Sequence, residues 1–179
     1  TELRRCVEVV QGYCLARREV RFDLVHEGRT LLTARATSAD GNGLRGRIGQ
    51  VFGQPFKERL SPIGPKELSA GGTVYGFVGD RETTRGRRLF VFVNQRLIRD
   101  RALLAIFYRA VRKEWKSDQF PALFLFLDVD PQNVDVNVHP QKTEVRFRDT
   151  GFLGGVARAL SKTLAESRGE EAAFAELVE

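Results

Sequence analysis

The stretch VDVNVHPQKTEVRF, residues 134–147, is the most informative part of the chain. At both of its ends apolar residues alternate with polar ones, which is the period-two pattern of half-buried strands, so the stretch predicts two paired strands. Between them, Pro140 fixes its own φ angle and biases His139 towards an extended backbone. Lys142 is therefore expected at a stiff turn, where its ammonium group can be directed at an anion. The plainer alternative is a solvated loop lysine.

A second segment, FVNQRLIRDR at residues 92–101, is typical of a strand, a turn and the start of a helix. Both segments closely resemble the MutL family of DNA mismatch-repair ATPases, in which the second segment is usually written F-V-N-G-R-x-(V/I)-R-D. Gln95 stands where the family has glycine, and a side chain at this position disfavours the positive φ angle of a tight turn. The resemblance also covers the opening helix, the hairpin at 20–34 and residues 71–164, and it is loose over 40–68.

The resemblance implies the fold and the domain organisation. We expect an α+β two-layer sandwich, with a mixed sheet, helices on one face and a left-handed β-α-β crossover around helix 101–115, like ribosomal-protein and gyrase B second domains. Residues 1–166 would form this transducer domain, and the acidic residues 167–179 a linker or frayed helix. The chain contains no methionine, so we expect an internal piece of a longer protein that has its ATPase domain upstream.

The resemblance also implies a mechanism. In the family the loop lysine, here Lys142, reaches the γ-phosphate of ATP bound in the preceding ATPase domain, where it favours the ATP-bound arrangement and stabilises charge in phosphoryl transfer. ATP and Mg²⁺ would be cofactors of the intact protein, an ATPase of the gyrase, chaperone and MutL superfamily. The chain alone is expected to bind neither and to be inactive. The implied partners are double-stranded DNA, the ATPase domain in cis, the mismatch-recognition protein MutS and a second copy of the intact protein.

The positive charge of the chain is concentrated in residues 81–116, where eleven bases against three acids give +8, more than the +6 of the whole chain. Such an excess suits a DNA backbone, because each phosphate contact releases condensed counterions. The alternative is a solvated surface whose charges pair with acidic segments. The family's basic groove makes Arg96, Arg99 and Arg101 the candidate DNA-binding residues, whereas Asp100 is expected to cap the following helix. No aromatic residues interleave with the bases, so binding should be sequence-independent and through phosphates.

Several other sites are excluded by the sequence. Cys6 and Cys14 are eight residues apart on an expected helix, about 12 Å along its axis, too far for a disulfide. With only two histidines, no zinc site can be assembled, and free cysteines indicate a reducing compartment such as the cytoplasm, at the nucleoid for a DNA-binding protein. No apolar run is long enough to span a bilayer.

A glycine motif at residues 41–46 is misleading. GNGLRG satisfies G-x-G-x-x-G, but it lacks the preceding hydrophobic strand of a dinucleotide-binding unit, so a loop that begins a helix is the better interpretation. Asn42 also breaks the D-x-G-x-G pattern of the MutL ATPase site. The nucleotide-binding domain itself is thus not expected within this chain.

Two functions from different classes remain: the transducer domain of a MutL-like ATPase, and a stand-alone basic nucleic-acid-binding module without ATPase coupling. The two segments at 92–101 and 134–147 favour the first, because a generic module has no reason to carry both.

Hydrophobic periodicity predicts the remaining elements. Strand 122–129 is nearly continuously apolar, so it is expected at the centre of the sheet. The expected helices are 2–18, 44–52 (ended by Gly53 and Pro55), 101–115 (with Leu104, Phe107, Tyr108, Val111 and Trp115 inward) and 152–166. The other expected strands are 20–25, 30–34, 73–78 and 89–94, and a loop with Pro62, Gly64 and Pro65 is expected to lead into strand 73–78.

Overall fold

The computed structural model describes residues 2–68, 71–80, 83, 88–115, 120–135 and 145–178. The helices are α1 (Glu2–Ala16), α2 (Gly41–Phe52), α3 (Gln54–Glu58), α4 (Arg101–Trp115) and α5 (Thr150–Val178), with a 3-10 turn at Pro131–Asn133. The strands are β1 (Phe22–His26), β2 (Arg29–Ala34), β3 (Leu60–Glu67), β4 (Thr73–Gly79), β5 (Leu89–Val93), β6 (Arg96–Ile98), β7 (Leu123–Asp128), β8 (Val134–Asp135) and β9 (Arg146–Phe147). Within the described residues, no helix is both long and apolar enough to cross a membrane.

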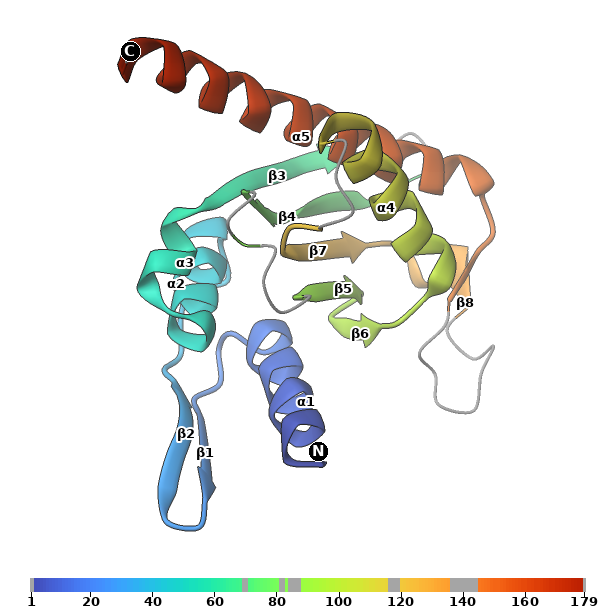
Figure 1. Ribbon diagram of the computed structural model, residues 1–179. Coiled ribbons are helices and arrows are strands. Elements are labelled where there is room, and N and C mark those ends of the chain that lie inside the picture. The colour runs from blue at the N-terminus through green and yellow to red at the C-terminus, as the bar shows by residue number, and fades with distance from the viewer. Residues whose placement is uncertain are drawn as a thin grey trace.

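A mixed five-stranded sheet in the order β3-β4-β7-β5-β6 forms the centre of the molecule. β7 is antiparallel to β4 but parallel to β5, and β6 and α4 connect β5 to β7. This crossover passes over the face that carries α4 and α5 and is left-handed (Figure 1), against the usual right-handed preference. The α+β class, the mixed sheet and the unusual crossover are thus confirmed, as is the central position of β7.

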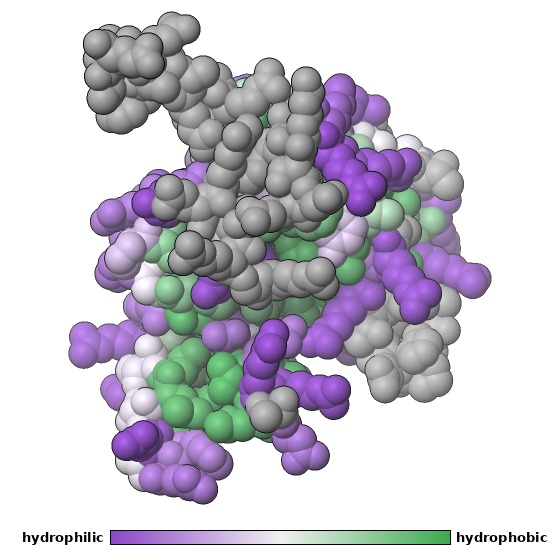
Figure 2. All heavy atoms as spheres, viewed as in Figure 1, coloured by the Kyte–Doolittle hydropathy of each residue, from purple (hydrophilic) through white to green (hydrophobic). Residues whose placement is uncertain are grey.

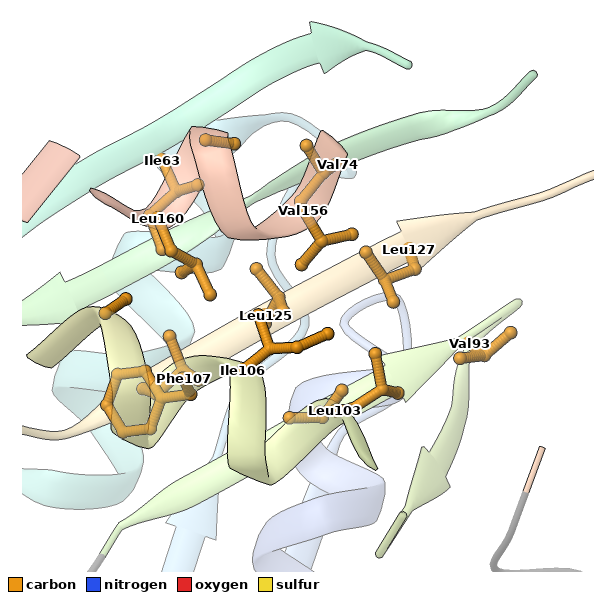
Figure 3. Packing of buried hydrophobic residues seen from close by; sticks show 14 of the residues in the cluster. Ile63, Val74, Val93, Leu103, Ile106, Phe107, Leu125, Leu127, Val156 and Leu160 are labelled. Carbon is orange, nitrogen blue, oxygen red and sulfur yellow. The ribbon is translucent and has the colours of Figure 1, made fainter. Parts of the chain in front are cut away.

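The face under α4 and α5 holds the larger hydrophobic core. Because side chains alternate along a strand, Leu123, Leu125 and Leu127 of β7 all point to this face. They pack against Ile106 and Phe107 of α4 and, further along the sheet, against apolar residues of α5 (Figure 3). Each fully buried side chain of this kind contributes about 1.5–3 kcal/mol through apolar burial.

The opposite face is lined by phenylalanine and packs against the N-terminal helices. Phe124 of β7 stacks on Phe90 with 5.7 Å between ring centroids, and Phe126 stacks on Phe92 at 4.5 Å. Leu15 of α1 and Ile48 of α2 are buried in the same cluster. Helices α1–α3 therefore add a layer over part of the sheet, beyond the helical layer that the resemblance implied.

The α1 helix and the β1–β2 hairpin lie to one side of the sheet, with the hairpin projecting away from it (Figure 1). Arg47 of α2 attaches their connection to the rest of the molecule: its guanidinium donates to the carbonyl oxygens of Arg17, Arg18 and Val20, the last at 2.6 Å. The Arg47 side chain is fully buried, and burial lowers its pKa.

One expectation is wrong: residues 60–67 form strand β3 rather than a loop. β3 pairs antiparallel with β4, with a bulge between Ile63 and Lys66 where Gly64 has φ 65°. As the edge strand, β3 can include Pro62 and Pro65, because a proline on an edge strand loses no hydrogen bond that the sheet needs. Because prolines are disfavoured within strands, the sequence alone did not predict β3.

Two helices differ in detail from their predictions. α2 begins at Gly41, three residues before the predicted start, because Asp40 caps it by accepting the Gly43 N–H at 2.7 Å. This hydrogen bond, with one from Ser38, lowers the pKa of Asp40. On α4 the predicted Phe107 is fully buried, but the other buried residues are Leu103, Ile106 and Ala110, and the predicted Leu104 and Tyr108 are only half-buried. The predicted Val111 and Trp115 side chains lie outside the described part of the chain.

α5 continues as one helix to Val178, so its backbone does not end at the predicted boundary near residue 166. The assignment of residues 1–166 as one domain stays a prediction. The paired strands predicted from residues 134–147 are confirmed at their base, where Val134 pairs with Phe147 and Asp135 with Arg146.

Gly76, in the middle of β4, provides a test of the sheet. Its φ is 148°, and a Cβ atom built on it would lie 1.9 Å from the carbonyl oxygen of Phe124 on β7. We expect Gly76→Ala to lower the free energy of unfolding by about 3 kcal/mol or more, through steric overlap and backbone strain, as measured by urea denaturation. Gly46→Ala is the matched control, because a Cβ at Gly46 in α2 meets open space. It should be neutral or stabilising by up to about 1 kcal/mol, and equal losses in both variants would contradict this account.

Candidate DNA-binding surface and phosphate-contacting loop

The turn between β5 and β6 positions the first candidate arginine. Asn94 and Gln95 have φ angles of 46° and 63°, so the tight turn forms although Gln95 replaces the family's glycine. Asn94 is held by the end of β7: its Nδ2 donates to the Val129 carbonyl and its Oδ1 accepts the Val129 N–H, both at 2.9 Å. Asparagine tolerates this backbone region better than most residues, and Gln95 is fixed by a hydrogen bond from Arg17 at 2.9 Å.

The three candidate arginines lie on β6, on the short connection that follows it and at the start of α4, at the free edge of the sheet. All three are exposed. Arg99 pairs with Glu8 of α1 at 3.1 Å, an exposed ion pair of small energy that an incoming phosphate can replace. Within the described residues, Arg96 and Arg101 form no ion pair. The structure thus brings the predicted set together on one edge.

Asp100 faces inward between two exposed arginines. Its Oδ1 accepts the N–H of Leu103 at 3.1 Å, which confirms the predicted cap of α4. Its Oδ2 accepts the N–H of Val145 at 3.3 Å, and Asp100 is only 9% exposed. One carboxylate therefore joins the arginine-bearing start of α4 to the segment that leads out of the 136–144 loop.

Lys142 itself lies outside the described residues, as do Val136 and Val138 of the predicted strand. The described ends of its loop are well anchored. Val145 is buried in the larger core, and Phe147 stacks on Phe152 of α5 with 4.6 Å between ring centroids. The Arg148 N–H donates to the Asn133 carbonyl at 3.0 Å, closing the base of the β8–β9 pair. The described segments on either side of residues 136–144 are therefore held by packing and hydrogen bonds.

The other bases in the predicted basic segment are arranged differently. Arg109, Arg112 and Lys113 are exposed on the second half of α4, away from its beginning. Arg88 lies over the rings of Phe52 and Phe56, at 5.4 and 5.0 Å from their centroids, so it packs on the core instead of the arginine edge. The remaining bases, Arg81, Arg85, Arg87 and Lys116, lie outside the described residues.

The sequence analysis missed the contribution of the end of α1 to this surface. Arg17 holds Gln95, and Arg18 donates to the Ala39 carbonyl at 2.7 Å, beside a small cleft of about 100 Å³ that Tyr75 and Gln95 also line. No local sequence pattern could have revealed these contacts, because Arg17 and Arg18 are far in sequence from Gln95 and Ala39. Burial raises the pKa of Tyr75, with a smaller contribution from the Asp128 carboxylate.

No group of side chains suited to a metal ion occurs among the described residues.

Comparison with known proteins decides the family. Residues 48–166 match the family model described as DNA mismatch repair protein, C-terminal domain. The chain belongs to the DNA mismatch repair protein family that includes MutL. The match includes most of residues 40–68, where the resemblance was loose, together with both of the segments that indicated the family.

The relatives in this family are whole MutL proteins. The chain is 41% identical to the DNA mismatch repair protein MutL of Myxococcus xanthus over 167 residues, which are 92% of this chain and 26% of that protein. It is 37% identical to MutL of Rickettsia bellii over 156 residues, 86% of this chain and 25% of the relative. The chain thus spans about a quarter of the length of the curated relatives it matches.

Solved structures share the fold. The crystal structure of the N-terminal domain of a DNA repair protein aligns with a TM-score of 0.66 at 24% identity, over 95% of this chain and 54% of that chain. The MutL ATPase domain of Aquifex aeolicus complexed with ADP aligns with a TM-score of 0.60 at 23% identity, over 90% of this chain and 48% of that chain. At these identities the likeness shows the fold of the MutL ATPase region.

Asp100 gives a test of how the site is assembled. Asp100→Ala should lower the free energy of unfolding by about 2–4 kcal/mol, because it removes a helix cap and leaves the buried N–H of Val145 without this acceptor. Asp149→Ala is the control: exposed Asp149 accepts the Gly151 N–H at 2.7 Å at the start of α5. That change should cost only about 1 kcal/mol, the usual value of a cap. Equal losses of unfolding free energy in the two variants, measured by chemical denaturation, would show that the contact of Asp100 with Val145 adds no stability.

Proposed function

We propose that this chain is the transducer domain of a MutL-type mismatch-repair ATPase, which binds the DNA backbone without sequence preference and contributes Lys142 to the ATP site of a preceding domain. The observation that carries the proposal is the exposed edge formed by Arg96, Arg99 and Arg101, in a chain whose family is that of DNA mismatch repair proteins. Membership in the family supports a repair function, and the arginine edge supports DNA as the ligand.

The chemistry of the arginine edge favours phosphate over bases. Its guanidinium groups extend from a sheet edge and a helix start, and neither element presents a protruding recognition helix that would enter a groove. In the described part of the chain, Arg99 pairs with Glu8, and the Asp100 carboxylate is directed inward at the N–H groups of Leu103 and Val145. Affinity should therefore come from counterion release and should decrease steeply with salt, equally for matched and mismatched duplexes.

The nucleotide part of the proposal rests on the family and on the well-anchored segments that flank residues 136–144. ATP and Mg²⁺ would be bound mainly by the upstream ATPase domain, and the Lys142 ammonium would stabilise negative charge on the γ-phosphate. Large hydrophobic residues with exposed side chains on α1, on the hairpin and between them could supply a surface for that domain; they are Leu3, Val9, Tyr13, Val20, Val25 and Leu31. Figure 2 shows an apolar patch in the region of α1 and the hairpin. MutS and a second copy of the intact protein are further partners proposed from the family.

Asp100 supplies a physical connection between the two activities. It contacts both the start of α4, beside Arg99 and Arg101, and Val145 at the end of the Lys142 loop. ATP that engages both domains would favour their docked arrangement, since a ligand shifts an equilibrium by its differential affinity for the two states. A displacement of the loop would then be transmitted to the arginine edge over a few residues, and the coupling would be reciprocal.

The lysine is tested in the intact protein. Lys142→Ala should lower the turnover number for ATP by about tenfold or more, because removal of one group that stabilises developing charge typically costs 10²–10³, while circular dichroism and thermal unfolding stay unchanged. The control is Lys66→Ala, an exposed lysine on edge strand β3. Unchanged turnover in Lys142→Ala would leave Lys142 as a solvated loop lysine, and would favour the stand-alone nucleic-acid-binding module.

The arginine edge is tested with this chain and duplex DNA. Arg101→Glu should weaken binding and reduce the slope of log K against log salt by about one unit, the value for one lost phosphate contact. Arg29→Glu, an exposed position on the hairpin, is the charge-matched control and should have a smaller effect on the slope.

The titration is made with matched and mismatched duplexes at several salt concentrations. If the affinity for DNA and its salt dependence were unchanged in Arg101→Glu, this residue would not contact DNA. A preference of the unmodified chain for the mismatch would contradict binding through the backbone alone.

A further inference from the structure

Helix α1 lies beside the edge strand β6, next to the arginine edge (Figure 1). Gly12 is buried against Leu97, where an added Cβ atom would lie only 2.8 Å from Cδ2 of Leu97. One helical turn earlier, Glu8 pairs with Arg99, directly after β6, at 3.1 Å. Helix and strand run in opposite directions, and four residues of a helix advance about 6 Å while two residues of a strand advance about 6.6 Å. The two contacts therefore fix α1 along this edge of the sheet.

Two further arginines lie on α1, one helical turn before Glu8. Residues three and four positions apart share one side of a helix, so Arg4 and Arg5 lie on the side of α1 that carries Glu8. Both are exposed, and neither forms an ion pair within the described residues. Because Glu8 itself contacts Arg99, Arg4 and Arg5 continue the arginine edge from the sheet onto the helix.

The exposed apolar residues of α1 do not compete for this side of the helix. Leu3 and Tyr13 are exposed, and at about 100° per residue they lie about 140° around the helix from Glu8. A domain that docks on the apolar side of α1 would therefore leave Arg4 and Arg5 accessible to a second ligand.

We propose that α1 is part of the DNA-binding surface: Arg4 and Arg5 contact phosphates beyond those held by the arginine edge, and Glu8 competes with phosphate for Arg99. This inference rests on the proposed DNA binding and extends it to a helix that precedes the sheet. Before DNA binds, the Glu8 carboxylate occupies the Arg99 guanidinium as a phosphate would. A phosphate that replaces it leaves a carboxylate in the surface, where like charges repel. Glu8 therefore lowers the affinity for DNA, whereas Arg4 and Arg5 raise it.

The arginines are tested by fluorescence anisotropy of a labelled DNA duplex with the full 179-residue chain at several salt concentrations. Arg4→Glu with Arg5→Glu should weaken binding by about tenfold or more and reduce the slope of log K against log salt by about two units, one for each lost phosphate contact. Glutamate is favourable in the first turn of a helix, so circular dichroism should stay unchanged. The control, Arg29→Glu with Arg35→Glu, makes the same charge change at exposed positions on and beside the hairpin and should change the slope by less than about half as much.

The competition is tested in the same titration with Glu8→Gln. This change should lower the Kd for DNA by about two- to fivefold, the range that corresponds to one exposed ion pair. Glu58→Gln removes the same charge from exposed Glu58 on α3, just before β3 at the opposite edge of the sheet. It should leave the Kd unchanged, because charges more than about 8 Å apart are screened at physiological salt.

Failure of this inference can be distinguished from failure of the proposed function. If the α1 pair of changes alters the slope no more than the hairpin pair does, or if Glu8→Gln leaves the Kd unchanged, the inference is overturned. The proposed DNA binding would still stand in either case, provided that Arg101→Glu weakens binding. A chain that binds no duplex DNA, or one in which Arg101→Glu has no effect, would instead contradict the proposed DNA binding and this inference with it.

Discussion

The burial of β7 on both faces is the constraint on which the rest of the structure depends. A strand with apolar side chains on each side needs a partner layer on each side, and here leucines meet α4 and α5 while phenylalanines meet the N-terminal helices. Its two edges are also occupied, by β4 in one direction and β5 in the other. The parallel pairing with β5 forces the chain to cross over the sheet between them, and that crossover is α4. The helix that begins beside the candidate DNA-binding residues is thus a consequence of how the central strand is paired.

The elements that carry the candidate site residues are connected to this strand by polar contacts at its end. Asn94 holds the β5–β6 turn to Val129, just after β7, through two hydrogen bonds. Asp100, six residues further on, holds Val145 in addition to its helix cap. Partly or largely buried hydrogen bonds of this kind are strong because little water competes for them, and they are costly to break. Together they connect the β5–β6 turn to the end of β7, and the start of α4 to Val145.

Much of the fold could be predicted because its signals are local. The alternation in β1 and β2, the apolar run of β7 and the periodicity of α4 each depend on neighbouring residues, and each was located within a few positions. β3 was missed because prolines normally exclude a strand, and only its place at the edge makes them harmless. The turn at Gln95 looked unfavourable because glutamine replaces the family's glycine there. The hydrogen bond that stabilises it comes from Arg17, which is distant in the sequence. Likewise, the partner of Arg99 is Glu8. Long-range pairs of this type have no signature in a single sequence, whereas the local motif that brings the three arginines together does.

The buried guanidinium of Arg47 has a consequence for how the molecule opens. It is the point at which α2 holds the connection between α1 and β1, and its Nε and Nη1 atoms have no hydrogen-bond partner. Releasing the hairpin would break the hydrogen bonds from this charged group to the carbonyl oxygens of Arg17, Arg18 and Val20 together, and a hydrogen bond to a charged group contributes about 1.5–3 kcal/mol. The N-terminal unit and the sheet are thus coupled into one cooperative opening unit, and amide protons near the ends of α1 and β2 should exchange with solvent at rates close to those of the core.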